Sequence, residues 1–360
     1  MAKKKGIDEL NNPITILVDL YKTKNAYSGL GQFSIQFAKA LLKNQTTNSL
    51  LSFLIPKNYP FKKVDHVNYI TSSFFNKILS RTFKQYSIWH SLHQFPTHKP
   101  SPQSKWILTI HDLNFMIEKT GIKRSKYLNQ LQKNINKADC ITTISEFSKQ
   151  EIIKHLNVNS KDVRVIYNGV LVSHTFSKPD FVNFPKFFFS IGIFNAKKNF
   201  HTLIPMMKLF PDYHLVIAGN KNTAYGKSIQ LEIDRLGLSN RVLLPGTITE
   251  ENKSWLFKNC EAFLFPSLAE GFGMPVIEAM NFGKPTFLST ATSLPEIGGE
   301  IAYYFENFEV NEMASLIKES LETISKDQHS FSEKSKKHAS KFSWDNSIQK
   351  YQELYKELTQ

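Results

Sequence analysis

Short runs of consecutive apolar residues alternate with helical patterns along this chain. A strand that is apolar on both faces must be covered on both, so the alternation is typical of parallel sheets with helices on either side. The candidate strands of the first half are residues 14–20, 50–55, 67–71, 87–92, 106–110, 140–144 and 163–167. Those of the second half are residues 187–193, 214–218, 242–244, 262–265 and 285–288. We therefore predict an α/β protein built from parallel sheets.

Helical patterns fill the intervals between these runs. They cover residues 32–42, 128–137, 147–155, 228–236, 275–282 and 342–358. The segment 170–185 is polar, contains two prolines and lacks periodicity, so it marks a domain boundary. A chain of 360 residues suits two domains of ordinary size. We predict two Rossmann-like, doubly wound domains, with ligands bound at the carboxyl ends of the strands in the cleft between them.

The net positive charge lies entirely in the first half. Residues 1–170 hold 25 Lys and Arg against 10 Asp and Glu, whereas residues 171–360 hold 20 against 21. Such a field attracts polyanions, which include nucleic acid, phosphorylated glycolipids and anionic bilayers. Residues 74–84 interleave aromatic with basic side chains, and the stretch 119–137 is also basic. Both stretches fit either surface helices or docking on an anionic membrane.

The sequence contains no apolar run of membrane-spanning length and no leader that ends in a small-residue cleavage site. We therefore expect a cytoplasmic protein, with docking on the inner face of the plasma membrane as the extension of the charge argument. Cys140 and Cys260 lie in separate strand-like runs. We expect two buried thiols rather than a disulfide or a metal pair.

Residues 265–280, Phe-Pro-Ser-Leu-Ala-Glu-Gly-Phe-Gly-Met-Pro-Val-Ile-Glu-Ala-Met, carry the densest chemistry. An apolar strand ends there, glycines follow, and Pro275 stands where the first turn of a helix favours proline. The free amides of such a helix start can hold an anion or a hydroxyl-rich ligand, and glycines allow close approach. Glu278 lies eight residues after Glu270, so both carboxylates can face one cleft. A carboxylate accepts two hydrogen bonds from a vicinal diol such as that of ribose.

This segment resembles the Glu-x7-Glu signature of the retaining GT-B glycosyltransferases of family 4. Further stretches fall in matching order across nearly the whole chain: residues 27–33 (Tyr-Ser-Gly-Leu-Gly-Gln-Phe), 109–113 (Thr-Ile-His-Asp-Leu), 144–148 (Ile-Ser-Glu-Phe-Ser), 165–170 (Val-Ile-Tyr-Asn-Gly-Val), 190–199 (Ser-Ile-Gly-Ile-Phe-Asn-Ala-Lys-Lys-Asn) and 342–344 (Phe-Ser-Trp). The resemblance implies a GT-B fold whose last helix crosses back to the first domain. The implied domains are residues 1–172 plus 342–360 on the acceptor side and residues 185–341 on the donor side.

The resemblance assigns the donor diphosphate to the backbone amide of Gly31 and to Lys198, which would neutralise the departing leaving group. Lys198 belongs to the loop that follows Gly192. The family commonly has an arginine after that glycine, where this chain has Ile193. A second cation is then absent or is supplied by Lys197. Fixed cations and amides would stabilise the leaving group without a divalent metal, and the sequence has no Asp-x-Asp motif at a strand end.

The resemblance also implies which groups contact the sugar. Glu270, with the amides of Gly271, Phe272 and Gly273, would contact the sugar being transferred, and Glu278 would hold the ribose.

The resemblance further implies that His111 reaches the donor sugar from the opposite domain, and His111 directly follows an apolar strand. His90 and His93 are further candidates, for contact with the acceptor.

We therefore expect a retaining hexosyltransferase that moves a mannosyl or glucosyl unit from a GDP- or UDP-linked sugar to a glycan or glycolipid, such as lipopolysaccharide or another surface polysaccharide. No other cofactor is expected. A sugar-nucleotide 2-epimerase of the same fold is the first alternative. A phosphorylase would need a pyridoxal-phosphate lysine and a longer chain. A non-enzymatic nucleic-acid-binding protein would explain the charge, but no nucleic-acid recognition motif is visible.

Overall fold

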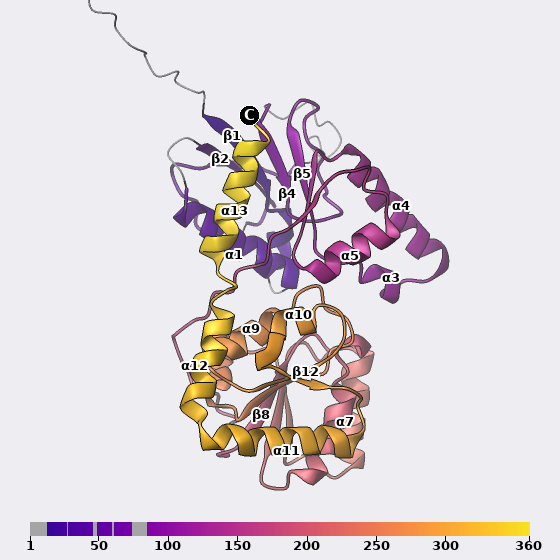
Figure 1. The fold of residues 1–360 in the computed structure, drawn as a ribbon, viewed down its shortest axis with the longest axis vertical. Helices are drawn as coiled ribbons and strands as arrows, with labels where there is room; N and C mark the ends of the chain where they lie inside the picture. Colours follow the sequence, from indigo (N-terminus) through magenta and orange to yellow (C-terminus); the bar gives the residue numbers. More distant parts are fainter. Residues whose placement is uncertain (1–12, 27, 46–48, 60, 74–84) are drawn as a thin grey trace, which may run out of the picture.

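The computed structural model describes residues 13–26, 28–45, 49–59, 61–73 and 85–360. Within these ranges the chain forms two parallel sheets, one from each half, and helices cover both (Figure 1). The α/β class predicted from the alternation of apolar and helical segments is confirmed. The basic-aromatic stretch 74–84 lies outside the described residues.

The first sheet has seven parallel strands in the order β3-β2-β1-β4-β5-β6-β7. Their bounds are β1 (Ile14–Asp19), β2 (Ser49–Ile55), β3 (Asn68–Thr71), β4 (Ile88–Ser91), β5 (Lys105–Ile110), β6 (Cys140–Thr143) and β7 (Val163–Val165). The chain moves outward in one direction from β1 and in the other from β4. The loops after these two central strands therefore begin side by side at the carboxyl edge of the sheet and lead to opposite sides.

The helices of this half cover both faces of the sheet. They are η1 (Tyr21–Asn25), α1 (Gly29–Lys43), α3 (Phe115–Glu118), α4 (Gly121–Lys137) and α5 (Glu146–His155). Each of α1 and α5 begins at a serine whose hydroxyl accepts a backbone N–H of the first turn. Such caps stabilise a helix start by about 1 kcal/mol.

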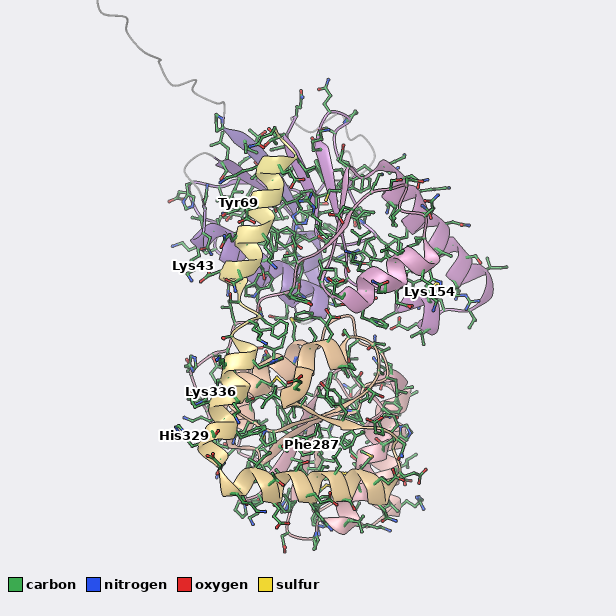
Figure 2. All side chains as sticks on the ribbon, in the orientation of Figure 1. Lys43, Tyr69, Lys154, Phe287, His329 and Lys336 are labelled. Atoms are coloured by element: carbon green, nitrogen blue, oxygen red, sulfur yellow. The ribbon has the colours of Figure 1, made fainter. Side chains whose placement is uncertain are left out.

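The second sheet has six parallel strands in the order β10-β9-β8-β11-β12-β13. Their bounds are β8 (Phe187–Ile191), β9 (His214–Ala218), β10 (Val242–Gly246), β11 (Ala262–Phe265), β12 (Thr286–Ser289) and β13 (Tyr303–Phe305). Here the order reverses between β8 and β11, so the loops that follow these two neighbouring strands begin side by side at the carboxyl edge of the sheet. Phenylalanines fill the core, and Phe287 is labelled in its interior in Figure 2.

The helices of the second half are η3 (Ala196–Lys198), η4 (Phe200–Thr202), α6 (Leu203–Met206), η5 (Met207–Leu209), α7 (Ala224–Arg235), α8 (Glu250–Asn259), α9 (Met274–Asn281), α10 (Leu294–Gly298), η6 (Gly299–Ile301), α11 (Val310–Lys326), α12 (Gln328–Ala339) and α13 (Trp344–Glu357). Figure 1 shows α9 and α10 on the side of the second half that faces the first. The glycine-rich loop that leads into α9 therefore lies where the two halves meet.

The last helix, α13, leaves the second half and packs beside α1 in the first, as predicted (Figure 1). Its Trp344, Tyr351 and Tyr355 are buried in the core of the first sheet together with Phe37. Lys43, labelled in Figure 2, pairs with Asp345 at 3.0 Å. The C-terminal helix thus completes a core that the first half of the chain begins.

Two chain segments cross between the halves, and they lie against each other. The Val170 amide donates to the Phe342 carbonyl at 3.0 Å. A Cβ at Gly169 would come within 2.4 Å of the Trp344 Cα atom, so only glycine fits there. The two crossings form one connection that is narrow and tightly packed.

The core of the first half contains a row of hydrogen-bonded polar side chains. His90 contacts Tyr355 Oη at 2.7 Å through Nδ1 and Thr109 Oγ1 at 2.8 Å through Nε2, and Thr109 in turn contacts Thr142 Oγ1 at 2.8 Å. His90 is completely buried, and burial lowers its pKa to about 3. The expectation that His90 contacts an acceptor is therefore wrong, because its ring joins β4 to α13 inside the core.

Strand β13 is the one strand of the described residues that the sequence did not predict. It has only three residues, two of them only partly buried, and it lies at the edge of the sheet. The predicted strand 187–193 ends early, at Ile191, because the chain turns into the lysine loop and leaves Ile193 half exposed. Both cysteines are free and buried, as expected.

Candidate active site

The loops after β8 and β11 meet at the reversal of the second sheet and bring a lysine to a glutamate. Lys198 Nζ lies 2.5 Å from Glu270 Oε1, and Ser267 Oγ donates to the same oxygen at 2.6 Å. The side chains of Lys198 and Glu270 are 12% and 15% exposed. The sequence predicted both residues as site residues, and the structure places them in direct contact.

Lys198 is held in place from several sides. Its ammonium lies 4.6 Å from the centroid of the Phe265 ring, a cation–π contact at the end of β11. A Cβ at Gly192 would stand 2.9 Å from Lys198 Cε, so the predicted Gly192 provides the space that the lysine stem occupies. One N–H of the ammonium goes to Glu270. An ammonium has three, so the others can serve an anionic ligand.

A third loop, residues 290–293 between β12 and α10, fixes the backbone around Glu270. The Glu270 amide donates to Thr292 Oγ1 at 3.0 Å, and Ser293 Oγ donates to the carbonyls of Glu270 and Phe272, each at 3.1 Å. Thr292 adopts a left-handed conformation with φ of 57°. A β-branched residue in this region costs about 1–3 kcal/mol, so surrounding contacts must hold it there. Sequence reasoning did not identify Ser267, Thr292 or Ser293.

The predicted glycine loop leads directly into α9. Gly273 has φ of 108°, and Pro275 occupies the first turn of the helix. Among the hydrogen bonds of the described residues, none uses the amides of Gly271, Phe272 or Gly273 as a donor. The Phe272 ring is buried against Tyr167 and Phe342. Its side chain therefore anchors the loop, while the three amides remain available for a ligand.

The first half contacts this loop through the residues that follow β5 and β6. A Cβ at Gly271 would lie 2.9 Å from the His111 carbonyl oxygen and 3.0 Å from Asp112 Cβ, so these two backbone segments are in contact. Ser145 Oγ donates to the Gly271 carbonyl at 2.9 Å. The glycine loop thus lies at the contact between the halves, with His111 beside it.

His111 is buried and electrically neutral. Its Nε2 lies 2.8 Å from the Leu92 carbonyl, and its ring meets that of Phe33 edge-on at 4.5 Å between centroids. Burial lowers the pKa of His111 to about 4, although the bond to Leu92 opposes this shift. Because Nε2 faces a carbonyl, it carries the proton, and Nδ1 is left as a hydrogen-bond acceptor.

Lys197 bridges the two halves. Its Nζ lies 2.9 Å from Glu118 Oε1 at the end of α3. Burial lowers the pKa of Lys197, but the hydrogen bond and the charge of Glu118, aided by Glu270 and Asp112, raise it above its usual value. Lys197 is therefore a permanent cation next to the Lys198–Glu270 pair.

Glu278 and Gly31 make their contacts elsewhere. Glu278, in α9, is buried and accepts from Lys253 Nζ at 2.8 Å. The Gly31 amide donates to the Ser28 hydroxyl at 3.1 Å and so takes part in the cap of α1. In the part of the chain that the structure describes, no hydrogen bond joins either residue to Lys198 or Glu270. Lys253 is a further residue that the sequence did not reveal.

Comparisons with known proteins indicate glycosyltransferases over most of the chain. The family model described as Glycosyltransferase Family 4 matches residues 48–174, and the model described as Glycosyl transferases group 1 matches residues 173–338. The O-antigen chain mannosyltransferase RfbU of Salmonella typhimurium is 26% identical over 322 residues, which is 84% of this chain and 90% of that protein.

Solved structures resemble the chain as a whole. The sucrose-phosphate synthase of Thermosynechococcus elongatus superposes with a TM-score of 0.75 at 17% identity and covers 96% of this chain and 99% of its own. HepE of Anabaena, solved with UDP and glucose, gives a TM-score of 0.71 at 18% identity over 95% of this chain and 99% of its own. At these identities the likeness concerns the fold.

Proposed function

The chain belongs to the glycosyltransferases of group 1 and family 4 and has the GT-B fold, and on that premise we propose the reaction that it catalyses. It transfers a mannosyl or glucosyl unit from a nucleoside-diphosphate sugar to a glycan or glycolipid, with retention of configuration. The observation that carries the proposal is the Lys198–Glu270 contact beside three available amides at the reversal of the second sheet. A fixed cation and open amides are what a leaving diphosphate requires.

In this proposal the donor lies over the second sheet, in the domain formed by residues 185–341. Lys198 neutralises the diphosphate. The permanent positive charge of Lys197 takes the place of the arginine that the family commonly has where this chain has Ile193. Glu278 accepts the ribose hydroxyls. The Gly31 amide would reach the diphosphate only after it gives up its bond to Ser28.

The transferred sugar lies between Glu270, the glycine-loop amides and His111. Neutral His111 offers Nδ1 as an acceptor to a sugar hydroxyl. The acceptor hydroxyl attacks from the face that the diphosphate leaves, and the departing phosphate takes its proton. The C1–phosphate bond breaks as the new C1–oxygen bond forms on the same face. The configuration at C1 is then retained, and no protein side chain has to act as base.

The names of similar proteins support a choice among the candidate substrates. RfbU is named as an O-antigen chain mannosyltransferase, and HepE was solved with UDP and glucose. A mannosyl donor and a surface-polysaccharide acceptor are therefore our first choice, with GDP and UDP as the candidate nucleotides. The acceptor contacts the domain formed by residues 1–172 and 342–360.

An exposed apolar patch in the first half supports docking at an anionic membrane. Ile117 and Ile122 are 67% and 89% exposed, and basic side chains surround them in sequence at Lys119, Lys123 and Arg124. Exposed apolar groups with cations close by in the sequence are typical of proteins that bind the interface of an acidic bilayer. No helix of the described residues is long and apolar enough to cross a membrane.

A donor screen tests the proposed function. The protein is incubated with UDP-, GDP- and dTDP-sugars, and nucleotide release, thermal protection and product masses are measured. We expect one donor to protect the protein and to raise the mass of an acceptor by one hexose. A 2-epimerase would leave every mass unchanged. Salt-sensitive DNA binding without protection by any donor would contradict the proposal.

A further inference from the structure

Glu278 has a partner from a neighbouring helix. Lys253 in α8 places Nζ 2.8 Å from Glu278 Oε1 and 2.7 Å from Oε2 of Glu250, one helical turn earlier. Helices α8 and α9 pack side by side, which brings the lysine to the glutamate. Glu250 is 62% exposed, whereas Lys253 and Glu278 are only 18% and 11% exposed. The Lys253–Glu278 contact is therefore the buried part of this cluster.

The two oxygens of Glu278 differ. Oε1 accepts from Lys253, whereas no described residue donates to Oε2. Oε2 is not fully buried, so solvent or a ligand can reach it. A carboxylate with one oxygen fixed and the other open is an acceptor with a defined direction.

The charges around Glu278 explain what Lys253 contributes. Burial raises the pKa of Glu278, while the charge and hydrogen bond of Lys253 lower it, and Glu250 adds a weak upward shift. Within the described residues these are the charged groups that face the carboxylate. Burial lowers the pKa of Lys253, yet Glu278 and Glu250 raise it well above its usual range. Lys253 thus stays charged and opposes protonation of Glu278.

We propose that Lys253 is a positioning residue for the nucleotide site: it fixes one oxygen of Glu278 and leaves the other free to accept from the vicinal hydroxyls of a ribose. This inference rests on the proposed function, in which Glu278 holds the ribose. It adds a residue outside the Glu-x7-Glu segment and assigns it an effect on nucleotide affinity. Lys253 itself does not touch the reacting atoms.

The test is a titration of GDP, UDP and their 2′-deoxy forms by calorimetry, at about pH 6 and about pH 8.5. The wild type should bind one ribonucleotide about tenfold more tightly than its 2′-deoxy form, as expected for a lost hydrogen bond to a charged group. Lys253→Met should weaken ribonucleotide binding about tenfold, and more at the lower pH than at the higher one, because the charge that opposes protonation of Glu278 is lost. Its preference for ribose should shrink in parallel.

Two further variants separate positioning from folding. Lys253→Arg keeps the charge and should retain most of the affinity. Lys336→Met removes an exposed lysine that pairs with Glu333 on α12 at 3.0 Å, and it should change nothing. If wild-type and Lys253→Met proteins show equal affinities and equal ribose preferences at both pH values, the role of Lys253 is refuted. A wild type that binds neither GDP nor UDP would instead overturn the proposed function, and the role of Lys253 with it.

Discussion

The two sheets carry their functional polar groups in different places. In the second sheet these groups follow the strands, in the loops that hold Lys198 and Glu270. In the first sheet a polar row lies within the strands themselves and ends at Tyr355 of α13. The difference teaches that polar substitutions in the loops of the second sheet should reduce catalysis, whereas polar substitutions inside the strands of the first sheet should reduce stability.

The largest effect should come from the lysine–glutamate contact. Lys198→Ala and Glu270→Ala should each lower turnover about 100-fold, or about 2.7 kcal/mol in barrier, because the leaving diphosphate and the sugar lose their fixed partners. The unfolding temperature should barely change. Steady-state kinetics with the donor from the screen provides the measurement. Lys336→Ala, on the outer face of α12 (Figure 2), is the control, and full activity of either site variant would remove its assigned role.

His90→Gln should affect stability rather than turnover. At neutral pH we expect a loss of about 2 kcal/mol in the free energy of unfolding, because a buried hydrogen-bonded row is broken. The wild-type advantage should shrink on acidification. The pKa of His90 is about 3 in the folded protein and 6.5 ordinarily, so below pH 6.5 the unfolded chain binds a proton that the folded chain refuses.

By linkage the advantage falls by up to about 1.4 kcal/mol per pH unit between those two values. Urea unfolding of both proteins over this range measures it. A difference that stays constant with pH would show that His90 titrates normally in the folded protein, against the buried placement.

The exposed isoleucines of the first half should affect only binding to a membrane surface. Combining Ile117→Ser with Ile122→Ser should lower co-sedimentation with anionic vesicles at low salt about tenfold, since each isoleucine loses its apolar transfer into the interface. Leu231→Ser, which replaces a 70% exposed leucine of the second half, is the matched control. Equal binding of the wild type to neutral and anionic vesicles would contradict membrane docking.

The smallest effect should come from Thr292. Thr292→Val removes the acceptor of the Glu270 amide and should lower turnover about threefold, whereas Thr292→Ser should keep the activity. Thr292→Gly relieves the left-handed strain, so it should raise the unfolding temperature while it lowers turnover. Parallel changes of stability and turnover in all three variants would assign Thr292 to the fold alone.

Local sequence was sufficient for most of the fold. Twelve runs of apolar residues became strands within a few residues of their predicted ends, because strands buried on both faces must be apolar throughout. Strand β13 was not predicted because it is short and half-buried at the sheet edge. The contact between Lys198 and Glu270 followed from topology, since β8 and β11 are neighbours.

The supporting residues could not be read in this way. Lys253 follows Glu250 by three residues, which by itself indicates an exposed helical ion pair. Only the packing of α8 against α9 brings it to Glu278. Thr292 belongs to a segment in which nothing marks a left-handed residue, because glycine or asparagine is the usual signal. Such residues act through contacts between elements, and a single sequence carries no local sign of them.

Because α13 packs on the first sheet, the hydrophobic core of that sheet cannot be completed until the last residues of the chain have been synthesised. Domains generally fold as they emerge from the ribosome, the N-terminal one first. Here Phe37 and His90 emerge early, but the tyrosines that cover them lie at positions 351 and 355. The second sheet and its strands, residues 187–305, are made entirely in between, so this core can close sooner. We therefore expect the nascent chain to fold from the middle outward, with the first domain completed last.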